Sequence, residues 1–476
     1  MFASHIQPFG LVATLASAIM ATPAMAQAEL PPDVQKSIIE RRIPEAAIWG
    51  MSAVNTDLMR QQMLTQTPGK VGDVIYWGRP LDWHNQTLTP NPDAIYFMVF
   101  YDTTGGEPVV LDLPAASDSG SFNGNIVDVW QVPLEDVGLL GIDAGAGGKF
   151  VLLPPGYDKP LPEGYSGLPL TTNTGYALLR SSLASHEPAD VDKAVAYGRQ
   201  VKVYPLSQAD NPPETAFHDV QDLVFDSTIK YDASFFTNLD RIVQTEPWLE
   251  RDRVMIDQLA SLGIVKGKPY APTEQTKALM DAGMKAVHAE LAAKYDAGLP
   301  PFWPGSRWMA PIFPVLAKEA AIGFSDPDVY PVDVRGLTYT YGYVGIKRLG
   351  TGQMYLISIK DADGNAFEGA SSYRLTVPPN VPVKQYWSVT VYDRETHALV
   401  KNMDRASRAS NAKDVVANAD GSVDVYFGPT APAGKQSNWV PTDPEREFEL
   451  MFRLYAPTEA LFDKSWHLPD VVKVEG

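Results

Sequence analysis

Short runs rich in Val, Ile, Tyr and Phe recur along most of this 476-residue sequence, and they constrain its fold more than any other feature. Gly, Pro, Asp and Asn separate these runs, among them DAIYFMVFYD, EPVVLDLP, GNIVDVWQVP, GKFVLLPPGY and RQVKVYPL. After Arg335 a second series contains QMYLISIK, KQYWSVTVYD, GSVDVYFGP and FELMFRLYAP. Many short strands between turn-forming residues are typical of β-sandwiches and barrels. The sequence therefore predicts two β domains.

Two other regions have helical periodicity. Between Pro31 and Gln66 apolar residues recur at mostly three- and four-residue steps, and Pro44 is expected to divide this region into two helices. A helical insert is expected between the β domains, with Thr273 as an N-cap. The predicted fold class is mainly β with helical segments (α+β), in which a helical insert separates two β-sandwich or jelly-roll-like domains. The expected parts are a signal peptide (1–26), N-terminal helices (27–70), a β domain (71–230), the helical insert and linker (231–334) and a C-terminal β-sandwich (335–476).

The first 26 residues resemble a secretory signal peptide. They contain no Lys, Arg, Asp or Glu, and an apolar run near residues 11–20 precedes the sequence TPAMA, which ends in an A-x-A pattern. The region before the apolar run departs from the usual pattern because it has no Lys or Arg. The run is shorter than the roughly 20 residues that span a bilayer. We therefore expect cleavage near Ala26 and a periplasmic or secreted protein.

Composition excludes several classes of site and partner. The chain has no cysteine, which rules out thiolate catalysis, zinc–cysteine sites and iron–sulfur clusters. Its formal net charge of −18 disfavours nucleic acid as a partner, and no segment after the signal is apolar for long enough to span a membrane. The expected partner is a small-molecule ligand or substrate, and a homo-oligomer is left open.

Familiar catalytic motifs are missing. GAGGK lacks the spacing of a phosphate-binding loop, DADG lacks the later ligands of a calcium loop, and no G-x-S-x-G or H-E-x-x-H occurs. The seven histidines are scattered singly, so a metal site would have to be assembled by the fold. No cofactor is predicted, although a divalent metal is compatible with the residues present.

The order of motifs resembles a known pair of domains. NPDAIY, VVLDLP, GGKFVLLPPGY, VKVYPL and FFTNLDRIV resemble DUF1254, a domain of unknown function. DADGNAFEGASSYRLTVPP, YWSVTVYD, DGSVDVYFGP, SNWVPT and FRLYAP look like its usual companion, DUF1214. LTPNPDAIY replaces the commoner NRDTLY-like form. The resemblance implies β-sandwich domains, jelly-roll-like at the C-terminus, and it implies no particular reaction.

The stretch WHNQTLTPNPD before the DAIYFMVFYD run is the leading candidate site. Asp93, His84 and Tyr96 are candidate catalytic residues, and Asn91 is a candidate ligand-binding residue, because together they could orient a water or hold a polar substrate. An alternative interpretation is structural, since Asn-Pro-Asp is strong turn chemistry. Strand alternation is expected to place Tyr96, Met98 and Phe100 on one face, which could form a binding wall.

Further candidate ligand-binding residues are aromatic or charged side chains in the β regions: Asp128, Trp130, Tyr204, Tyr341, Trp387, Arg405 and Trp439. Tyr339, Tyr341 and Tyr343 alternate in GLTYTYGYVG, as expected for one face of a strand, and Arg453 and Tyr455 share a face in FRLYAP. Aromatic rings next to arginines could stack on a carbohydrate or an aromatic acid. They could equally fill a sandwich core.

Three functions are consistent with these features. The first is an exported protein that binds a small polar or aromatic ligand, including a saccharide, in a cleft between β domains. The alternative is a periplasmic hydrolase or lyase, metal-dependent or not, that uses Asp93 with His84 or Tyr96. A third is a structural role in assembly. Whether the protein is an enzyme is left open.

Overall fold

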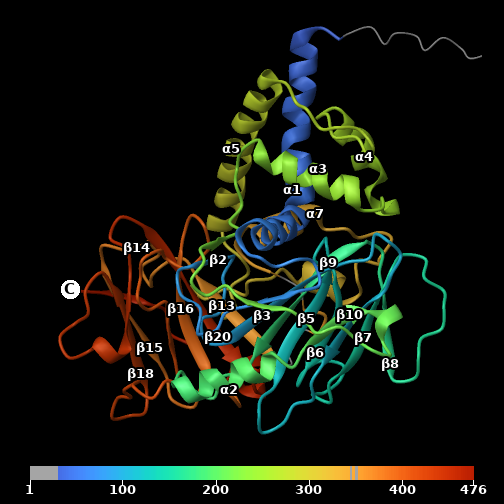
Figure 1. Ribbon diagram of the computed structural model, residues 1–476. Coiled ribbons are helices and arrows are strands. Elements are labelled where there is room, and N and C mark those ends of the chain that lie inside the picture. Colours follow the sequence, from blue (N-terminus) through green and yellow to red (C-terminus); the bar gives the residue numbers. More distant parts are fainter. Residues whose placement is uncertain (1–29, 344–345, 349–351, 476) are drawn as a thin grey trace, which may run out of the picture.

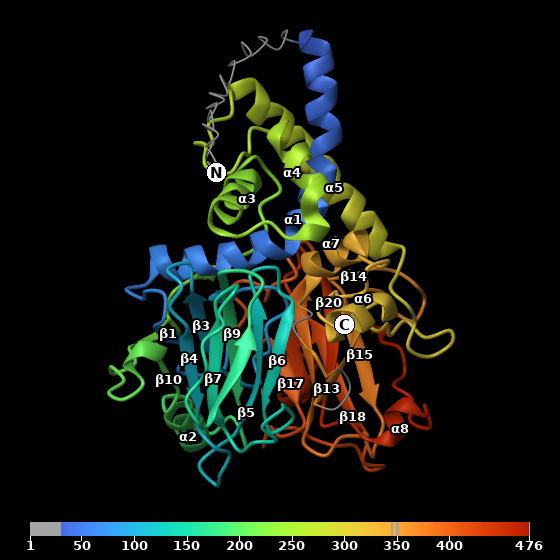
Figure 2. The same cartoon turned by 90° about the vertical axis from the view of Figure 1, so that its right-hand side faces the viewer.

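A computed structural model describes residues 30–343, 346–348 and 352–475. The expected signal peptide lies outside these residues. Two β-sandwiches stand side by side, and helices cover one end of both, with several helices projecting away from the strands (Figures 1 and 2). This arrangement confirms the predicted α+β fold class, with a helical segment between two β regions.

The N-terminal sandwich contains a six-stranded sheet and a four-stranded sheet. The first has the order β11 (Phe217–Asp219), β1 (Val74–Tyr76), β3 (Ile95–Asp102), β9 (Thr174–Ser181), β5 (Phe122–Asp128) and β6 (Pro133–Gly138). The second has the order β10 (Lys202–Pro205), β4 (Val109–Leu113), β7 (Gly148–Leu153) and β8 (Tyr165–Pro169). A short parallel pair, β2 (Asn85–Gln86) and β12 (Phe225–Asp226), lies outside both sheets.

The C-terminal sandwich also has two sheets. One has the order β13 (Gln353–Ser358), β20 (Glu447–Tyr455), β16 (Trp387–Asp393) and β17 (Ser407–Ala409), with β14 (Phe367–Glu368) paired to β20. The other has the order β19 (Trp439–Pro441), β18 (Val423–Gly428), β15 (Ser372–Val377) and β21 (Val472–Val474).

Strand alternation gives the inner sheet of each sandwich two different buried faces. On β3, Phe97 and Val99 join the core of the N-terminal sandwich, whereas Met98 joins a central core that extends between the domains and under the helices. On β20, Phe452 joins the core of the C-terminal sandwich and Met451 joins the central core. The predicted face of Tyr96, Met98 and Phe100 is confirmed, because all three side chains belong to the central core. Polar residues on these faces are therefore buried between the two domains.

The N-terminal region forms one bent helix, α1 (Pro32–Gln66), and the prediction of two helices is wrong. Figure 2 shows the two parts of α1 running in different directions, the second across the upper end of the N-terminal sandwich. Pro44 lies inside the helix and lacks the N–H for one helical hydrogen bond, which a bent helix tolerates. α1 packs against α3 (Ser234–Thr245), α4 (Arg253–Ala260), α5 (Glu274–Asp296) and α7 (Val332–Tyr341). Thr273 caps α5 as predicted, since its side chain accepts a hydrogen bond from the Thr276 N–H.

The alternating tyrosines lie on α7 and not on a strand, so that prediction is wrong. Tyr339 and Tyr341 fall in the last turn of this helix, and Tyr343 follows it. Every residue from Arg335 to Tyr341 is buried, so the helix has no polar face that would reveal its period in the sequence. The remaining helices are α2 (Pro188–Gly198), α6 (Pro314–Ala321) and α8 (Glu459–Phe462). Within the described part of the chain, no helix is both long and apolar enough to cross a bilayer.

Candidate functional site

A cavity of about 90 Å³ lies between the two sandwiches, beneath α7. The N-terminal domain contributes Tyr96 of β3 and Arg180 of β9, and the C-terminal domain contributes Tyr355 of β13 and Arg453 of β20. Tyr341 of α7 also lines the cavity. Each strand residue lies on the face of its sheet that points into the central core, which is why residues far apart in the sequence meet here.

Both arginines of this cavity make hydrogen bonds to neutral groups only. Arg453, which is 1% exposed, donates to the Thr390 hydroxyl over 2.9 Å and to the Thr89 carbonyl over 2.9 Å, and its Nε is buried without a hydrogen-bond partner. Arg180 donates from Nε to the Tyr96 hydroxyl over 3.2 Å and from Nη1 to Asn125 over 3.0 Å. Among the described residues, no carboxylate lies within ion-pair distance of either guanidinium.

The tyrosines around these arginines supply no negative charge. Burial raises the pKa of the Tyr355, Tyr392 and Tyr455 phenols above the ordinary value of 10, so all three are neutral at pH 7. The ring of Tyr355 lies 5.2 Å from the Arg453 guanidinium, and that of Tyr96 lies 5.4 Å from Arg180. Cation–π contacts stabilise a guanidinium without neutralising it. The cavity therefore carries an excess of positive charge.

The stretch WHNQTLTPNPD is both a turn before β3 and part of this cavity. The Asn91 side-chain oxygen accepts the Asp93 N–H over 3.0 Å, as expected for an Asn-Pro-Asp turn. The Asn91 amide nitrogen donates to the Tyr455 hydroxyl over 2.5 Å, and the Asn91 N–H donates to the Tyr96 hydroxyl over 3.1 Å. The turn thus joins the two domains. Of the predicted catalytic and ligand-binding residues, Asn91, Tyr96 and Tyr341 line this cavity together.

Asp93 and His84 lie apart from this group. Asp93 is fully buried between the domains, where its Oδ1 accepts from the Ser407 hydroxyl over 3.0 Å and lies 3.3 Å from His186 Nε2. Its Oδ2 is buried without a hydrogen-bond partner. His84 pairs with Asp82 over 2.7 Å and stacks on Trp83. Asp93 therefore links the domains next to the cavity without lining it.

Asp128 and Trp130 are buried at the end of β5. Asp128 accepts the Val132 N–H over 2.8 Å, and burial raises the pKa of its carboxyl to about 6. Trp130 packs against Trp49 with ring centroids 4.6 Å apart, and its carbonyl accepts a hydrogen bond from Arg335. Asp128 also lines a separate surface groove. Asp128 and Trp130 therefore have the structural role that the sequence left open as the alternative to ligand binding.

The other predicted ligand-binding residues are separated from the cavity. Tyr204 is buried against β4 and β7, and Trp387 stacks on Phe452 in the C-terminal core. Arg405 donates to the Trp439 carbonyl over 2.9 Å, and the Trp439 indole donates to the Gly428 carbonyl over 2.9 Å. These contacts are structural, and Trp387 in particular fills the core of the sandwich.

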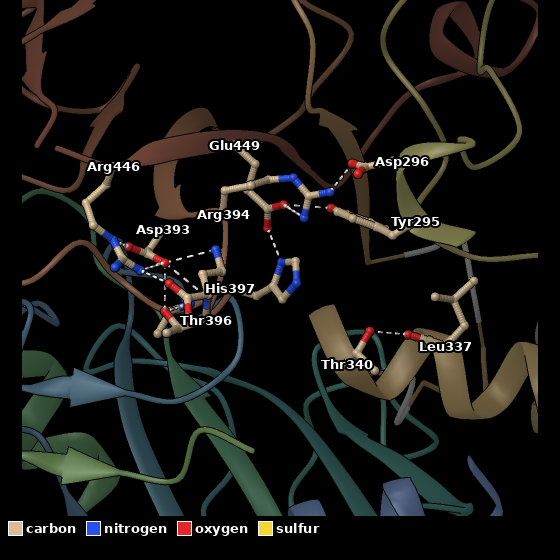
Figure 3. A network of polar contacts seen from close by, with 12 residues as sticks. Tyr295, Asp296, Leu337, Thr340, Asp393, Arg394, Thr396, His397, Arg446 and Glu449 are labelled. Carbon is tan, nitrogen blue, oxygen red and sulfur yellow. Dashed lines mark hydrogen bonds and ion pairs between the residues drawn. The ribbon is translucent and has the colours of Figure 1, made fainter. Parts of the chain in front are cut away.

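A second pocket, of about 370 Å³, opens where α5 meets the C-terminal sandwich. His397 and Arg394 from the turn after β16 line it, together with Tyr295 and His288 of α5. Figure 3 shows the Glu449 carboxylate between Tyr295, Arg394 and His397. Glu449 is fully buried and lies on the same face of β20 as Arg453. Sequence reasoning missed His397 and Glu449, because the two partners lie 52 positions apart.

Metal ligation by clustered side chains is not seen in the described ranges. Across residues 30–343, 346–348 and 352–475, no group of three or more His, Asp or Glu side chains is placed to hold a metal ion. The divalent metal left open from the sequence thus gains no support from the geometry.

Family comparisons agree with the two-domain architecture. Residues 72–205 match the model described as protein of unknown function (DUF1254), and residues 352–459 match protein of unknown function (DUF1214). The chain belongs to the DUF1254/DUF1214 family. The interdomain cavity thus lies between its two domains, with Tyr96 and Arg180 in the DUF1254 region and Tyr355 and Arg453 in the DUF1214 region.

The crystal structure of a Vibrio parahaemolyticus protein shows a similar fold. The DUF1254/DUF1214 chain is similar to the crystal structure of the VPA0106 protein from Vibrio parahaemolyticus, with 18% identity, a TM-score of 0.56, and coverage of 92% of this chain and 100% of the other. An uncharacterized protein from Burkholderia cenocepacia is 14% identical, with a TM-score of 0.41 over 92% of this chain and 96% of the other. A comparison with curated protein sequences gives no match.

Proposed function

We propose that this protein binds a small carboxylate anion in the cavity between its two β domains. The observation that carries the proposal is the pair Arg180 and Arg453, which line one interdomain cavity without a carboxylate partner in the described chain. A buried charge without a counter-charge is costly, and an anionic ligand would remove that cost. Guanidinium groups also match the planar, two-oxygen geometry of a carboxylate.

The size of the cavity limits the ligand. An engineered cavity of about 150 Å³ accommodates benzene, so a space of about 90 Å³ suits a shorter molecule. Carboxylates with about two to four carbons fit this volume, whereas a sugar ring or an aromatic acid would require the walls to move. Tyr96, Tyr341 and Tyr355 would contact the short apolar part of such a ligand.

Export is part of the same proposal. The first 26 residues have the pattern of a secretory signal, and the chain has no cysteine that oxidation could affect. We propose that the mature protein begins after Ala26 and binds its ligand in the periplasm or outside the cell. N-terminal sequencing of protein recovered from the periplasmic fraction tests this part, and a sequence that starts at Met1 would contradict it.

Calorimetric titration with propionate and with its neutral analogue propionamide tests the binding proposal. Propionate is expected to bind and propionamide is not, because only the anion compensates the two guanidinium groups. Arg453→Met and Arg180→Met are each expected to weaken propionate binding at least tenfold, or about 1.4 kcal/mol. Arg253→Met is the control, since Arg253 is exposed and pairs with Glu250. Equal binding of propionate and propionamide, or wild-type binding in both cavity variants, would overturn the proposal.

A further inference from the structure

The second pocket contains a histidine held in one orientation by a buried carboxylate. His397 Nδ1 lies 2.9 Å from Glu449 Oε1, and the carboxylate is fully buried. An ionised carboxylate accepts hydrogen bonds only, so the neutral imidazole of His397 donates from Nδ1 and has its lone pair on Nε2. The His397 side chain is 11% exposed and lines the pocket, where Nε2 can meet a molecule that enters. An imidazole with this tautomer can accept a proton.

Glu449 is itself fixed by two further groups. The Tyr295 hydroxyl donates to its Oε2 over 2.8 Å, and Arg394 Nη1 lies 3.7 Å from the same oxygen (Figure 3). Arg394 lies over the Tyr295 ring and also donates to Asp296. The carboxylate therefore cannot rotate away from His397, and it would stabilise an imidazolium formed there.

His397 has a strained backbone. Its φ is +55°, a left-handed conformation that is uncommon for residues other than Gly, although Asn, Asp and His adopt it more often than the rest. The Asp393 carbonyl accepts the His397 N–H over 2.8 Å, and the His397 carbonyl accepts the Thr89 N–H over 2.7 Å, so the strained turn is held on both sides. Strain of this kind is concentrated at functional sites, where the surroundings fix one side chain in place.

The charges around the pocket favour an uncharged molecule. Its two arginines are already paired, Arg394 with Asp296 and Arg446 with Asp393. Arg446 also pairs with Glu395 over 2.9 Å, and the remaining charged side chains of the lining, Glu445 and Glu447, are acidic. These carboxylates would repel an anion, and the stacked rings of Tyr231 and His288, 4.2 Å apart, offer an aromatic wall. An anion is thus expected in the interdomain cavity and a neutral molecule here.

We propose that His397 and Glu449 form a general acid–base pair that activates water for the hydrolysis of an uncharged ester. His397 Nε2 takes a proton from water while the water oxygen forms a bond to the ester carbonyl carbon. The tetrahedral intermediate collapses with cleavage of the bond to the alkoxy oxygen, and the imidazolium gives its proton to that leaving oxygen. Glu449 remains ionised throughout and acts as a positioning residue. This proposal goes beyond ligand binding between the domains and does not depend on it.

Hydrolysis of p-nitrophenyl acetate, an uncharged ester, tests the proposal in the full-length protein. His397→Asn is expected to lower the protein-dependent rate about 100-fold, the contribution of a positioned base. Asn is chosen because it tolerates the left-handed backbone at this position. His218→Gln is the matched control: His218 also pairs with a carboxylate, Asp73, over 2.9 Å, but does not line the pocket. A wild-type rate in His397→Asn, or no hydrolysis by the wild-type protein, would overturn the proposal.

The pH profile distinguishes proton transfer from a structural role. In wild-type protein the rate should rise with pH as the imidazolium loses its proton, and in Glu449→Gln the midpoint should move to lower pH, because the negative charge that stabilised the imidazolium is gone. Wild-type protein treated with diethyl pyrocarbonate should lose activity as His397 is modified, and it should regain activity with hydroxylamine. This experiment needs no substitution, so an effect of a substitution on folding cannot explain its result. An unchanged midpoint in Glu449→Gln, or full activity after modification of His397, would contradict the assignment.

Discussion

The Thr89 N–H donates a hydrogen bond of 2.7 Å to the His397 carbonyl, and both residues have left-handed backbones, with φ of +37° and +55°. The Thr89 carbonyl in turn accepts a 2.9 Å hydrogen bond from Arg453 Nη2. A continuous chain of contacts therefore connects the arginine of the interdomain cavity to the histidine of the second pocket. Two strained residues at its centre are held in place by each other's hydrogen bonds.

This contact predicts that the two sites are coupled. Arg453→Met removes the donor to Thr89 and is expected to move the NMR signal of the His397 ring. Arg180→Met removes a guanidinium from the same cavity without touching Thr89, so it should leave that signal unchanged. Equal shifts in the two variants would mean that Thr89 does not transmit the change.

The pair of Asp93 and His186 predicts a pH-dependent contribution to stability. The hydrogen bond to Asp93 raises the pKa of His186 above its ordinary value of 6.5. The stabilisation is therefore fully present below pH 6.5 and is lost as the pH rises through the pKa of the folded state. It should amount to about 0.5–1 kcal/mol, since His186 is partly exposed. Urea unfolding of wild-type protein and His186→Gln at pH 6 and pH 8 measures it, and a difference that does not change with pH would refute it.

For Glu246 we expect a larger loss of stability with rising pH. Burial raises the pKa of its carboxyl to about 7, although Thr174 and Asn173 donate hydrogen bonds to it. The folded state favours the protonated acid, so the free energy of unfolding should fall by about 3 kcal/mol as the pH rises from about 4.5 to 7. Glu246→Gln can keep both contacts, because Thr174 can also accept a hydrogen bond.

Urea unfolding at pH 5 and pH 8 checks this expectation. The wild-type protein should be less stable at pH 8, and Glu246→Gln should lose most of that difference. Glu274→Gln, at the exposed start of α5, serves as the control and should keep the wild-type pH dependence. If Glu246→Gln kept it too, the carboxyl would be ionised in the folded protein throughout this range.

The sequence predicted the strands that short Val-, Ile-, Tyr- and Phe-rich runs form between turn residues. β3 is an example: both of its faces are buried, and the predicted alternation of its residues matched the two cores that they join. α7 could not be predicted in this way, since Thr and Tyr alternate in its buried last turns and resemble a strand, and no exposed face there marks a helical period. The cap of α5 by Thr273 was predictable because a cap depends on neighbouring residues only.

The candidate sites were harder to predict, because their members meet only after folding. Arg180 lies 84 positions from Tyr96, and His397 has no acidic partner near it in the sequence other than residues of its own turn. One signal was present in the FELMFRLY run. Glu449 and Arg453 are charged residues in the buried, otherwise apolar part of the strand, and both lie on the face opposite to Phe448 and Phe452. Charged residues at such positions require partners from elsewhere in the fold.

Because Phe452 lies on the face of β20 that points into the C-terminal sandwich, its substitution is expected to affect stability. Phe452 is fully buried in the C-terminal sandwich, with its ring 5.5 Å from that of Trp387 and 6.1 Å from that of Trp308. Phe452→Ala should lower the free energy of unfolding by about 3–5 kcal/mol, because it removes the ring and leaves a cavity. Val254→Ala is the control: Val254 is 73% exposed, and the change should stay within about 0.5 kcal/mol. Urea unfolding followed by tryptophan fluorescence reports on this core directly, since indole rings surround the substituted position. A loss below about 1 kcal/mol in Phe452→Ala would place Phe452 outside the packed core and reverse the assignment of the two β20 faces on which both proposed sites depend.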